Sequence, residues 1–565
     1  MGDLEDTIEV VDLPNFRLEG ASAFDVDASG SGTTAEVYTS ATVELPEVVR
    51  LFVVYFNKQL KSGNVYEVHS AYEATFNKLT DRLYKTSPWP TAEVVSPLVG
   101  GDATFLLLYR ELYFRHLYSR LTPTLQQRID SWANYEALFS LLLDGDAPAD
   151  LALPNQWIWD LVDELIYQFQ AWSMFRQRLK SKSAEEIAIL KQRADVWSVT
   201  SVLGMLHRMA ERAKEPRFAS VPLYEIGGYF ATVGLLRVQC LLADYTLALK
   251  TVEAVDLSRK GLFTKVTSCH ISVFYYVAFA YLMSRRYVDA IRTLSQILFY
   301  IGRTKQYHTR SAQFEQILKK NEQMYALLAI AISLCPQHQV DENISSTLRD
   351  KYGDRMLRMQ ANLTDLAAYE ELFAFSCPKF LSAAPPPYEA PEDYHPQEAY
   401  RLQLKLFLAE VKQQAMLPTV RSLLKLYTTI GIPKLAELLD EAESGGDAEG
   451  AFREQLQCLK HKTHALVHSG GSPISGSLAS SADVDFYVDG DMARAGRALH
   501  SSSPALRGRR AALLSLGARG GQFPHAPPLG LLCPPDREAR RDHCEHQGAG
   551  AVRHAEAPQS PAAGE

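Results

Sequence analysis

Two stretches of the chain decide its fold: Gly234-Leu-Leu-Arg-Val-Gln-Cys-Leu-Leu-Ala-Asp-Tyr245-Thr-Leu-Ala248 and Tyr276-Val-Ala-Phe-Ala-Tyr-Leu-Met-Ser-Arg-Arg-Tyr287-Val-Asp-Ala290. Tyr245 and Tyr287 are forty-two residues apart, and so are Ala248 and Ala290. Each stretch is typical of a helical hairpin, with a small residue where the two helices cross and an aromatic residue at the turn. Equal spacing of both features favours two copies of one structural unit.

These units resemble tetratricopeptide hairpins with a somewhat longer period. Two unrelated helix pairs that share ordinary packing residues are the alternative. Stacked hairpins form an extended surface, and such surfaces usually bind proteins. The repeat therefore indicates a binding protein rather than an enzyme.

The same helical pattern extends toward the N-terminus. Val48, Leu51, Phe52 and Tyr55 follow the spacing i, i+3, i+4, i+7, which places one apolar stripe along a helix. Alternating strand patterns are nearly absent before residue 474. We therefore predict a mainly α-helical protein with a helical-repeat region over residues 44–310.

A pair of tryptophans, Trp157 and Trp159, lies at helical spacing close to Asp160, Asp163 and Glu164. An aromatic pair beside carboxylates can line a ligand pocket. Aromatic residues at helical spacing are far more often core residues, and we predict a core position for both.

After the proline-rich break at residues 385–396 the order of elements changes. Apolar positions predict a helix over 404–411, a second over 420–427, a short third that begins at Pro433, and a fourth over 447–463 capped by Asp447. Two strands, 474–478 and 484–488, follow as a hairpin. A winged helix has a helix, a short helix, a helix and then a hairpin in this order. We therefore predict a winged helix within residues 401–492.

The last helix of this unit is the candidate nucleic-acid contact. Its expected outward face carries five hydrogen-bonding side chains: Arg453, Gln457, Lys460, His461 and His464. Residues 401–468 hold nine Lys or Arg and eight Asp or Glu, which is less basic than a nucleic-acid reader normally is. This balance favours a solvated face or a protein contact over direct RNA contact. The second strand, with Val484, Phe486 and Val488, leaves an edge that a partner subunit could extend.

Composition excludes several classes of protein. The net charge of −8 gives no overall attraction to nucleic acid, and seven scattered cysteines are typical of reduced thiols in the cytoplasm. The longest strongly apolar run, Val273 to Met283, is too short to span a bilayer, and residues 1–40 lack a signal peptide. No nucleotide-binding, hydrolase or metalloprotease signature occurs, so we expect no catalytic residue, no cofactor and no metal site.

Both ends of the chain differ in composition from the middle. Residues 1–43 are acidic and poor in apolar side chains, and we expect disorder there. Residues 493–565 contain ten Arg, fifteen Ala, nine Gly and eight Pro but no Lys, Ile, Asn, Thr, Tyr or Trp. Translation in a wrong frame or through an intron would produce this bias, and a genuine low-complexity tail is the alternative. Under either interpretation we expect it to be disordered.

Several long strings resemble subunit L of eukaryotic translation initiation factor 3. Among them are Leu153-Pro-Asn-Gln-Trp-Ile-Trp-Asp160, Asn321-Glu-Gln-Met-Tyr-Ala-Leu-Leu-Ala-Ile330, Lys351-Tyr-Gly-Asp-Arg-Met-Leu-Arg-Met-Gln360 and Asp483-Val-Asp-Phe-Tyr-Val-Asp489. The resemblance runs from about residue 44 to Met492. It implies a PCI-type domain over residues 311–492, in which helical repeats end in a winged helix that packs beside the winged helices of sister subunits.

The resemblance also implies partners. These are the other subunits of the factor, with subunits K and E nearest, and the small ribosomal subunit to which the factor recruits mRNA and initiator tRNA. In the family a C-terminal helix follows the last wing strand, and here the Arg/Ala/Gly/Pro tail stands in its place. Two functional classes follow: a non-enzymatic scaffold subunit, and a winged-helix RNA binder that acts on its own.

Overall fold

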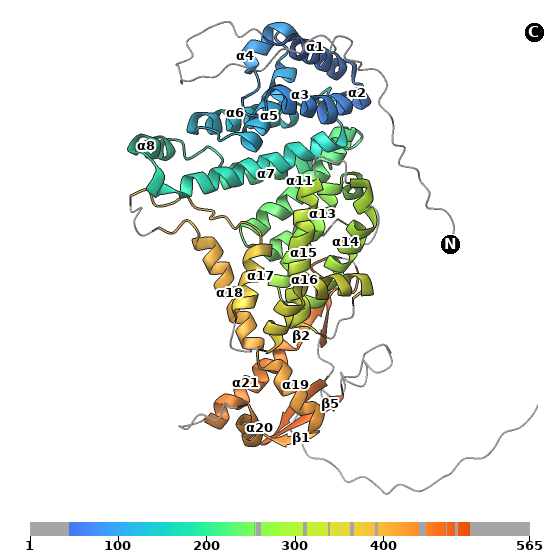
Figure 1. Ribbon diagram of the computed structural model, residues 1–565, viewed down its shortest axis with the longest axis vertical. Coiled ribbons are helices and arrows are strands. Elements are labelled where there is room, and N and C mark those ends of the chain that lie inside the picture. Colours follow the sequence, from blue (N-terminus) through green and yellow to red (C-terminus); the bar gives the residue numbers. More distant parts are fainter. Residues whose placement is uncertain are drawn as a thin grey trace, which may run out of the picture. The chain divides into compact units, whose positions relative to one another are not determined.

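The computed structural model describes residues 45–253, 255, 261–308, 314–336, 340–361, 366–389, 394–439, 448–470, 472–480 and 484–497. The predictions for residues 1–43, and for the tail from residue 498 onward, lie outside these ranges. Within them the chain is mainly helical with few strands, as the sequence predicts (Figure 1).

The first part of the chain is a series of helices around one core. They are α1 (Glu47–Ser62), α2 (Val65–His69), α3 (Phe76–Leu83), α4 (Ala92–Val95), α5 (Ala103–Arg120), α6 (Leu125–Leu143), α7 (Asn155–Gln177), α8 (Ala184–Gln192), α9 (Val199–Arg212) and α10 (Pro216–Ala219), with short non-α turns η1 (Ser70–Thr75), η2 (Ser96–Val99) and η3 (Leu179–Ser181). Local sequence sets several boundaries. Asp102 caps α5 by accepting the Phe105 N–H, and Thr124 forms a capping box with Gln127 at the start of α6.

Both tryptophans considered above are core residues. Trp157 is fully buried, and its ring stacks between Phe56 and Tyr72 at centroid distances of 5.5 and 4.8 Å. Its indole N–H donates to the buried Glu111 carboxylate at 3.1 Å. Trp159 packs edge-on against Phe230 of the next layer. The core prediction is confirmed because all these faces are already occupied.

The two repeat units form two helical hairpins of the same design. The first is α11 (Pro222–Leu241) with α12 (Tyr245–Thr251), and the second is α13 (Thr267–Met283), preceded by η4 (Leu262–Lys265), with α14 (Tyr287–His308). Tyr245 and Tyr287 both begin the second helix, and Ala248 and Ala290 are both fully buried.

The turns of the two hairpins match in backbone geometry. Ala243 (φ 65°) and Arg285 (φ 62°) occupy equivalent left-handed positions, which is uncommon for residues other than glycine. In each turn the N–H of the next residue donates to the carbonyl oxygen five residues earlier. Asp244 donates to Gln239 and Arg286 donates to Tyr281, both at 2.9 Å. Both helices therefore end in the same Schellman motif, which confirms the repeat.

Two further layers complete the large core. They consist of α15 (Phe314–Leu334), α16 (Glu342–Ala361), α17 (Ala367–Ser376) and α18 (Glu398–Gln414). Phe407 and Val411 of α18 belong to the large core, and Phe407 stacks on Phe373 of α17 at 4.5 Å. This helix, assigned by sequence to the winged unit, thus packs with the helical layers instead.

A second, separate core defines the C-terminal unit. It contains α19 (Leu417–Leu426), β1 (Thr429–Gly431), α20 (Ile432–Leu438), α21 (Ala448–Lys462), β4 (Val484–Asp489) and β5 (Met492–Arg497). The three-stranded sheet has the antiparallel order β1-β5-β4. Three helices against such a sheet are consistent with a winged helix.

The predicted hairpin of 474–478 with 484–488 is wrong. Residues 477–480 form β3 and pair with β2 (His464–Val467), whereas β4 pairs with β5. The strands are also not confined to a hairpin within 474–489. The first of them begins at residue 429 and the last ends at residue 497, with α20 and α21 between β1 and β2. The sheet continues past the expected tail boundary at residue 493, and Ala493 is fully buried in the second core.

Glycines in α11 allow a close helix crossing, which gives a stability prediction. A Cβ at Gly228 would lie 2.2 Å from the Ala213 Cβ and 3.2 Å from the Met209 carbonyl oxygen of α9. Gly228→Ala should lower the free energy of unfolding by about 1–3 kcal/mol because this crossing would have to open. Gly302→Ala is the matched control, since a Cβ there meets no atom within 4 Å and should stabilise α14 by about 0.5–1 kcal/mol. Urea unfolding of both variants measures this, and equal midpoints would contradict the crossing geometry.

Candidate interaction surface of the C-terminal unit

A buried ion pair of the second repeat hairpin holds the loop between β2 and β3, which lies in sequence between α21 and β4 of the C-terminal unit. Arg286 and Asp289 are 4% and 2% exposed, and their side chains pair at 2.7 Å. Arg286 donates to the carbonyl oxygens of residues 473, 474 and 475 at 2.9–3.0 Å, and Asp289 accepts the His468 N–H at 2.9 Å. The loop between β2 and β3 is thereby fixed to the start of α14. We call this set of contacts the Arg286 clamp.

Neighbouring groups reinforce the clamp. Tyr281 donates its hydroxyl to the Pro473 carbonyl at 2.9 Å, and its ring lies 4.7 Å from the Arg286 guanidinium carbon. Burial raises the pKa of Tyr281 to about 12, so the hydroxyl keeps its proton and remains a donor at physiological pH. Glu410 of α18 adds a second link, because it pairs with both Arg285 and Lys462.

The clamp was not predicted from the sequence. A signal is present, because the positions of Arg286 and Asp289 are held by Asp244 and Leu247 in the first repeat. Asp244 there only caps its own helix, by accepting the Leu247 N–H. A charged pair that occurs at these positions in only one of the two repeats indicates which repeat contacts another part of the chain.

The five predicted contact residues of α21 do not share one free face. Arg453 pairs with Asp491 of the β4–β5 turn at 2.6 Å, while Gln457 and His461 are exposed and Lys460 is half-buried. His464 is not on the helix at all. The helix ends at Lys462, and His464 begins β2 with its ring Nδ1 3.0 Å from the Lys460 carbonyl oxygen.

The predicted strand edge lies at the outside of the sheet. β4 is an outer strand, and among the described strands only β5 pairs with it. Phe486 points inward and is 3% exposed, so its side chain is a core residue rather than a subunit contact. Val488 also packs against that core. The backbone of β4 and the exposed side chain of Tyr487 face outward. Val484 lies in the strand, and its side chain is outside the described set.

The direction of the N–H groups of β4 can be assigned from one hydrogen bond. The Phe486 N–H donates to the Asp485 carboxylate at 2.9 Å and not to β5, so it faces the open edge of the sheet. Because N–H directions alternate along a strand, the Val488 N–H faces the same way. A bound side chain at an edge amide is one way to blunt an edge against unwanted pairing.

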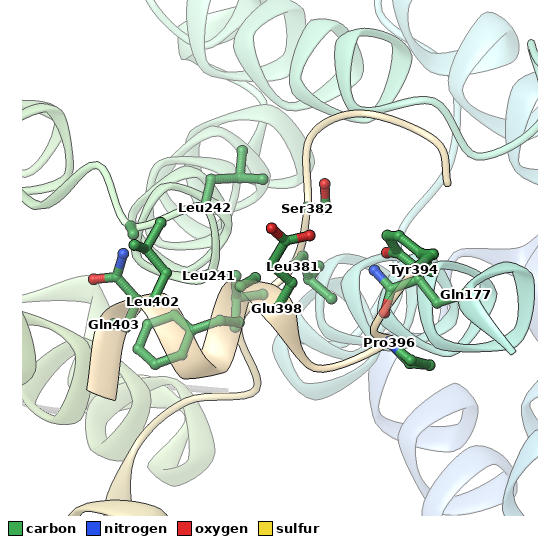
Figure 2. Close-up of a pocket in the computed structure, with 13 residues that line it drawn as sticks. Gln177, Leu241, Leu242, Leu381, Ser382, Tyr394, Pro396, Glu398, Leu402 and Gln403 are labelled. Carbon is green, nitrogen blue, oxygen red and sulfur yellow. The ribbon is translucent and has the colours of Figure 1, made fainter. Parts of the chain in front are cut away.

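A pocket of about 270 Å³ lies between the end of α11 and the start of α18 (Figure 2). Leu241 and Leu242 line one side, and Glu398, Leu402 and Gln403 line another. Glu398 is the one carboxylate of the described lining, which includes no cationic side chain. This lining lacks the paired ionisable groups of an acid–base catalytic site.

In the described part of the chain, no group of three or more His, Cys, Asp or Glu side chains is arranged to hold a metal ion. None of the described helices is long and apolar enough to cross a bilayer.

Fold and surface together define a class of protein: a helical-repeat array that carries a small winged-helix-like unit with an open strand edge. Residues 127–495 match the family model described as RNA polymerase I-associated factor PAF67. The chain is 46% identical over 467 residues to eukaryotic translation initiation factor 3 subunit L of Nematostella vectensis, covering 79% of this chain and 87% of the relative. The Danio rerio and Homo sapiens subunits are 45% and 44% identical over 489 residues, covering 79% of this chain and 83% and 85% of theirs.

The chain belongs to the subunit L family of eukaryotic translation initiation factor 3. Its relatives are named as subunits of an initiation factor, and the matching family model indicates no enzymatic activity.

Removal of one partner of the clamp should release the β2–β3 loop. Asp289→Ala leaves the buried Arg286 guanidinium without its counter-charge, and the expected loss is about 3–5 kcal/mol of stability. Hydrogen–deuterium exchange of residues 464–480 should accelerate in the same variant, because a two-stranded hairpin is marginal by itself. Arg292→Ala is the control: its side chain is 52% exposed beside the same Asp289, and it should cost less than about 1 kcal/mol. Unchanged exchange in Asp289→Ala would rule out the clamp.

Proposed function

We propose that this chain is a non-enzymatic scaffold subunit of the eukaryotic translation initiation factor 3 assembly. In this proposal it binds sister subunits, subunits K and E first among them, and supports recruitment of mRNA and initiator tRNA to the small ribosomal subunit in the cytoplasm. Residues 44–310 act as the helical-repeat region, and residues from 311 through β5 act as a PCI-type domain.

The observation that carries the proposal is the outer strand β4. Its Val488 N–H group faces away from β5, as strand addition by another chain requires. The Phe486 N–H faces the same way, but it would first have to leave the Asp485 carboxylate. The Arg286 clamp supports the proposal further, because a partner bound at the C-terminal unit is then fixed to the helical array and not to a loosely tethered module.

Direct RNA binding by α21 as an independent function has less support. Arg453, the first of the predicted donors, is engaged by Asp491, and His464 belongs to β2. Gln457 and His461 remain exposed and are proposed contacts for either a partner or RNA. A steep loss of RNA affinity with salt for the isolated chain, removed by substitutions at α21, would favour the independent RNA binder.

A backbone substitution tests the strand edge. Val488→Pro removes an outward N–H while the N–H groups of Tyr487 and Asp489 still face β5, so the sheet should survive. We expect this variant to lose sister subunits in affinity purification from a cytosolic extract. Val488→Thr is the matched control, because it keeps both the amide and the shape and should keep the subunits.

Thermal unfolding of the same two proteins separates lost pairing from lost folding. Retention of every sister subunit by a folded Val488→Pro variant would refute pairing through β4. Loss of subunits by both variants would do the same, because the edge amide would then not be the cause.

A further inference from the structure

Two cations contact one aromatic ring at the C-terminal end of α7, far in sequence from the C-terminal unit, and a third cation lies between that ring and Lys182 in the sequence. The chain there reads Phe175-Arg-Gln-Arg-Leu-Lys-Ser-Lys182, with a basic residue at every second position. Arg128, from the first turn of α6, joins this segment. We call Arg128, Arg178, Lys182 and Phe175 the α7-end cluster.

The Phe175 ring holds two of these cations in place. The Arg128 guanidinium carbon lies 4.6 Å from the centre of the ring, and the Lys182 ammonium nitrogen lies 3.2 Å from it. Arg128 is also 5.3 Å from the centre of the buried Tyr118 ring. Such contacts fix the direction of a cation without neutralising its charge. Arg128 and Lys182 are therefore pre-organised and still positive.

No carboxylate of the described residues forms an ion pair with Arg128, Arg178 or Lys182. Glu186 attracts Lys182, but its carboxylate accepts the Ser183 N–H in a capping box at the start of α8. Burial lowers the pKa of Arg128, and the charge of Arg178 lowers it further. Burial likewise lowers the pKa of Lys182, and the charges of Arg128 and Arg178 add to that effect. Three cations that repel one another are stabilised when an anion binds between them.

The helix dipole accounts for part of this arrangement. Cations near the last turn of a helix are stabilised by its unpaired carbonyl groups, and Arg178 and Lys182 follow the end of α7. The dipole of α7 does not account for Arg128, which lies in the first turn of another helix, where a positive charge is unfavourable. The rings of Phe175 and Tyr118 hold Arg128 in place, and an anion bound beside it would offset its charge.

An exposed aromatic residue distinguishes between two kinds of polyanion. Tyr167 is 44% exposed and lies two turns before Phe175 on α7, about 12 Å along the helix axis. Burial and the charge of Glu164 raise the pKa of its hydroxyl, and the charge of Arg128 acts in the opposite direction. A free aromatic face beside several cations is the pattern by which proteins hold single-stranded nucleic acid, with bases stacked and phosphates neutralised. An acidic polypeptide would need the cations and not the ring.

We propose that Tyr167 and the α7-end cluster form a contact site for single-stranded RNA, in which Arg128, Arg178 and Lys182 hold phosphates and Tyr167 stacks on a base. The site is separate from α21 and from the β4 edge, and it does not depend on pairing with sister subunits. It gives the chain an RNA contact on its helical array.

The test is fluorescence anisotropy of a labelled oligouridylate bound to the full chain over a range of salt concentrations. Arg178→Gln with Lys182→Gln should weaken binding about tenfold and reduce the slope of log affinity against log salt by about 1.4, the value for two lost single-strand phosphate contacts. Arg50→Gln with Lys58→Gln is the matched control, because both are exposed on α1 and the charge change is the same. This control should bind as the unaltered chain does.

Tyr167 is tested by two further variants with unchanged charge. Tyr167→Ala should weaken binding several-fold and leave the salt slope unchanged, and Tyr167→Phe should keep the affinity because the ring remains. The site is refuted if both double variants weaken binding equally, since the attraction would then be diffuse. It is also refuted if Tyr167→Ala has no effect while polyglutamate displaces the RNA at equal charge, which would assign the cluster to acidic polypeptides. Co-purification of sister subunits, measured in parallel, should be unchanged in all these variants, so this outcome is independent of the β4 proposal.

Discussion

The contact between Arg286 and the three carbonyl oxygens of residues 473–475 is the constraint on which the arrangement of the described chain depends. A guanidinium group carries five N–H donors in a fixed plane, and here they meet backbone carbonyls and the Asp289 carboxylate. A buried arginine without these partners would be strongly destabilising. The β2–β3 loop and α14 therefore keep their positions together or lose them together.

This constraint gives the C-terminal unit its mechanical role. The unit has its own small core around Leu456 and Phe486. The Glu410 link joins its α21 to α18, and the clamp fixes the β2–β3 loop, which follows α21, to the start of α14. A strand added to β4 would then be held in a fixed direction relative to the repeats, which suits the proposed scaffold function.

Sequence patterns were sufficient for the helical array and not for the sheets. The forty-two-residue spacing predicts both hairpins because small and aromatic residues are required wherever helices cross and turn, and the structure adds the matching left-handed residues Ala243 and Arg285. The pairing of 474–478 with 484–488 failed because alternation identifies strands without their partners. The backbone of residues 473–475 is committed to Arg286, nearly 190 residues away in sequence, and no local pattern records that contact. The prediction for His464 failed for a related reason, since the helical spacing continued the pattern past Lys462, where α21 ends.

The central claim is that β4 is the edge to which a sister subunit adds a strand. Hydrogen–deuterium exchange of single amides, compared between the isolated chain and the chain within its assembly, tests this most directly. We expect the outward Val488 amide to exchange rapidly in the isolated chain and to become protected in the assembly, while the inward amides of Tyr487 and Asp489 are protected in both. Equal exchange at Val488 in the two states would contradict this.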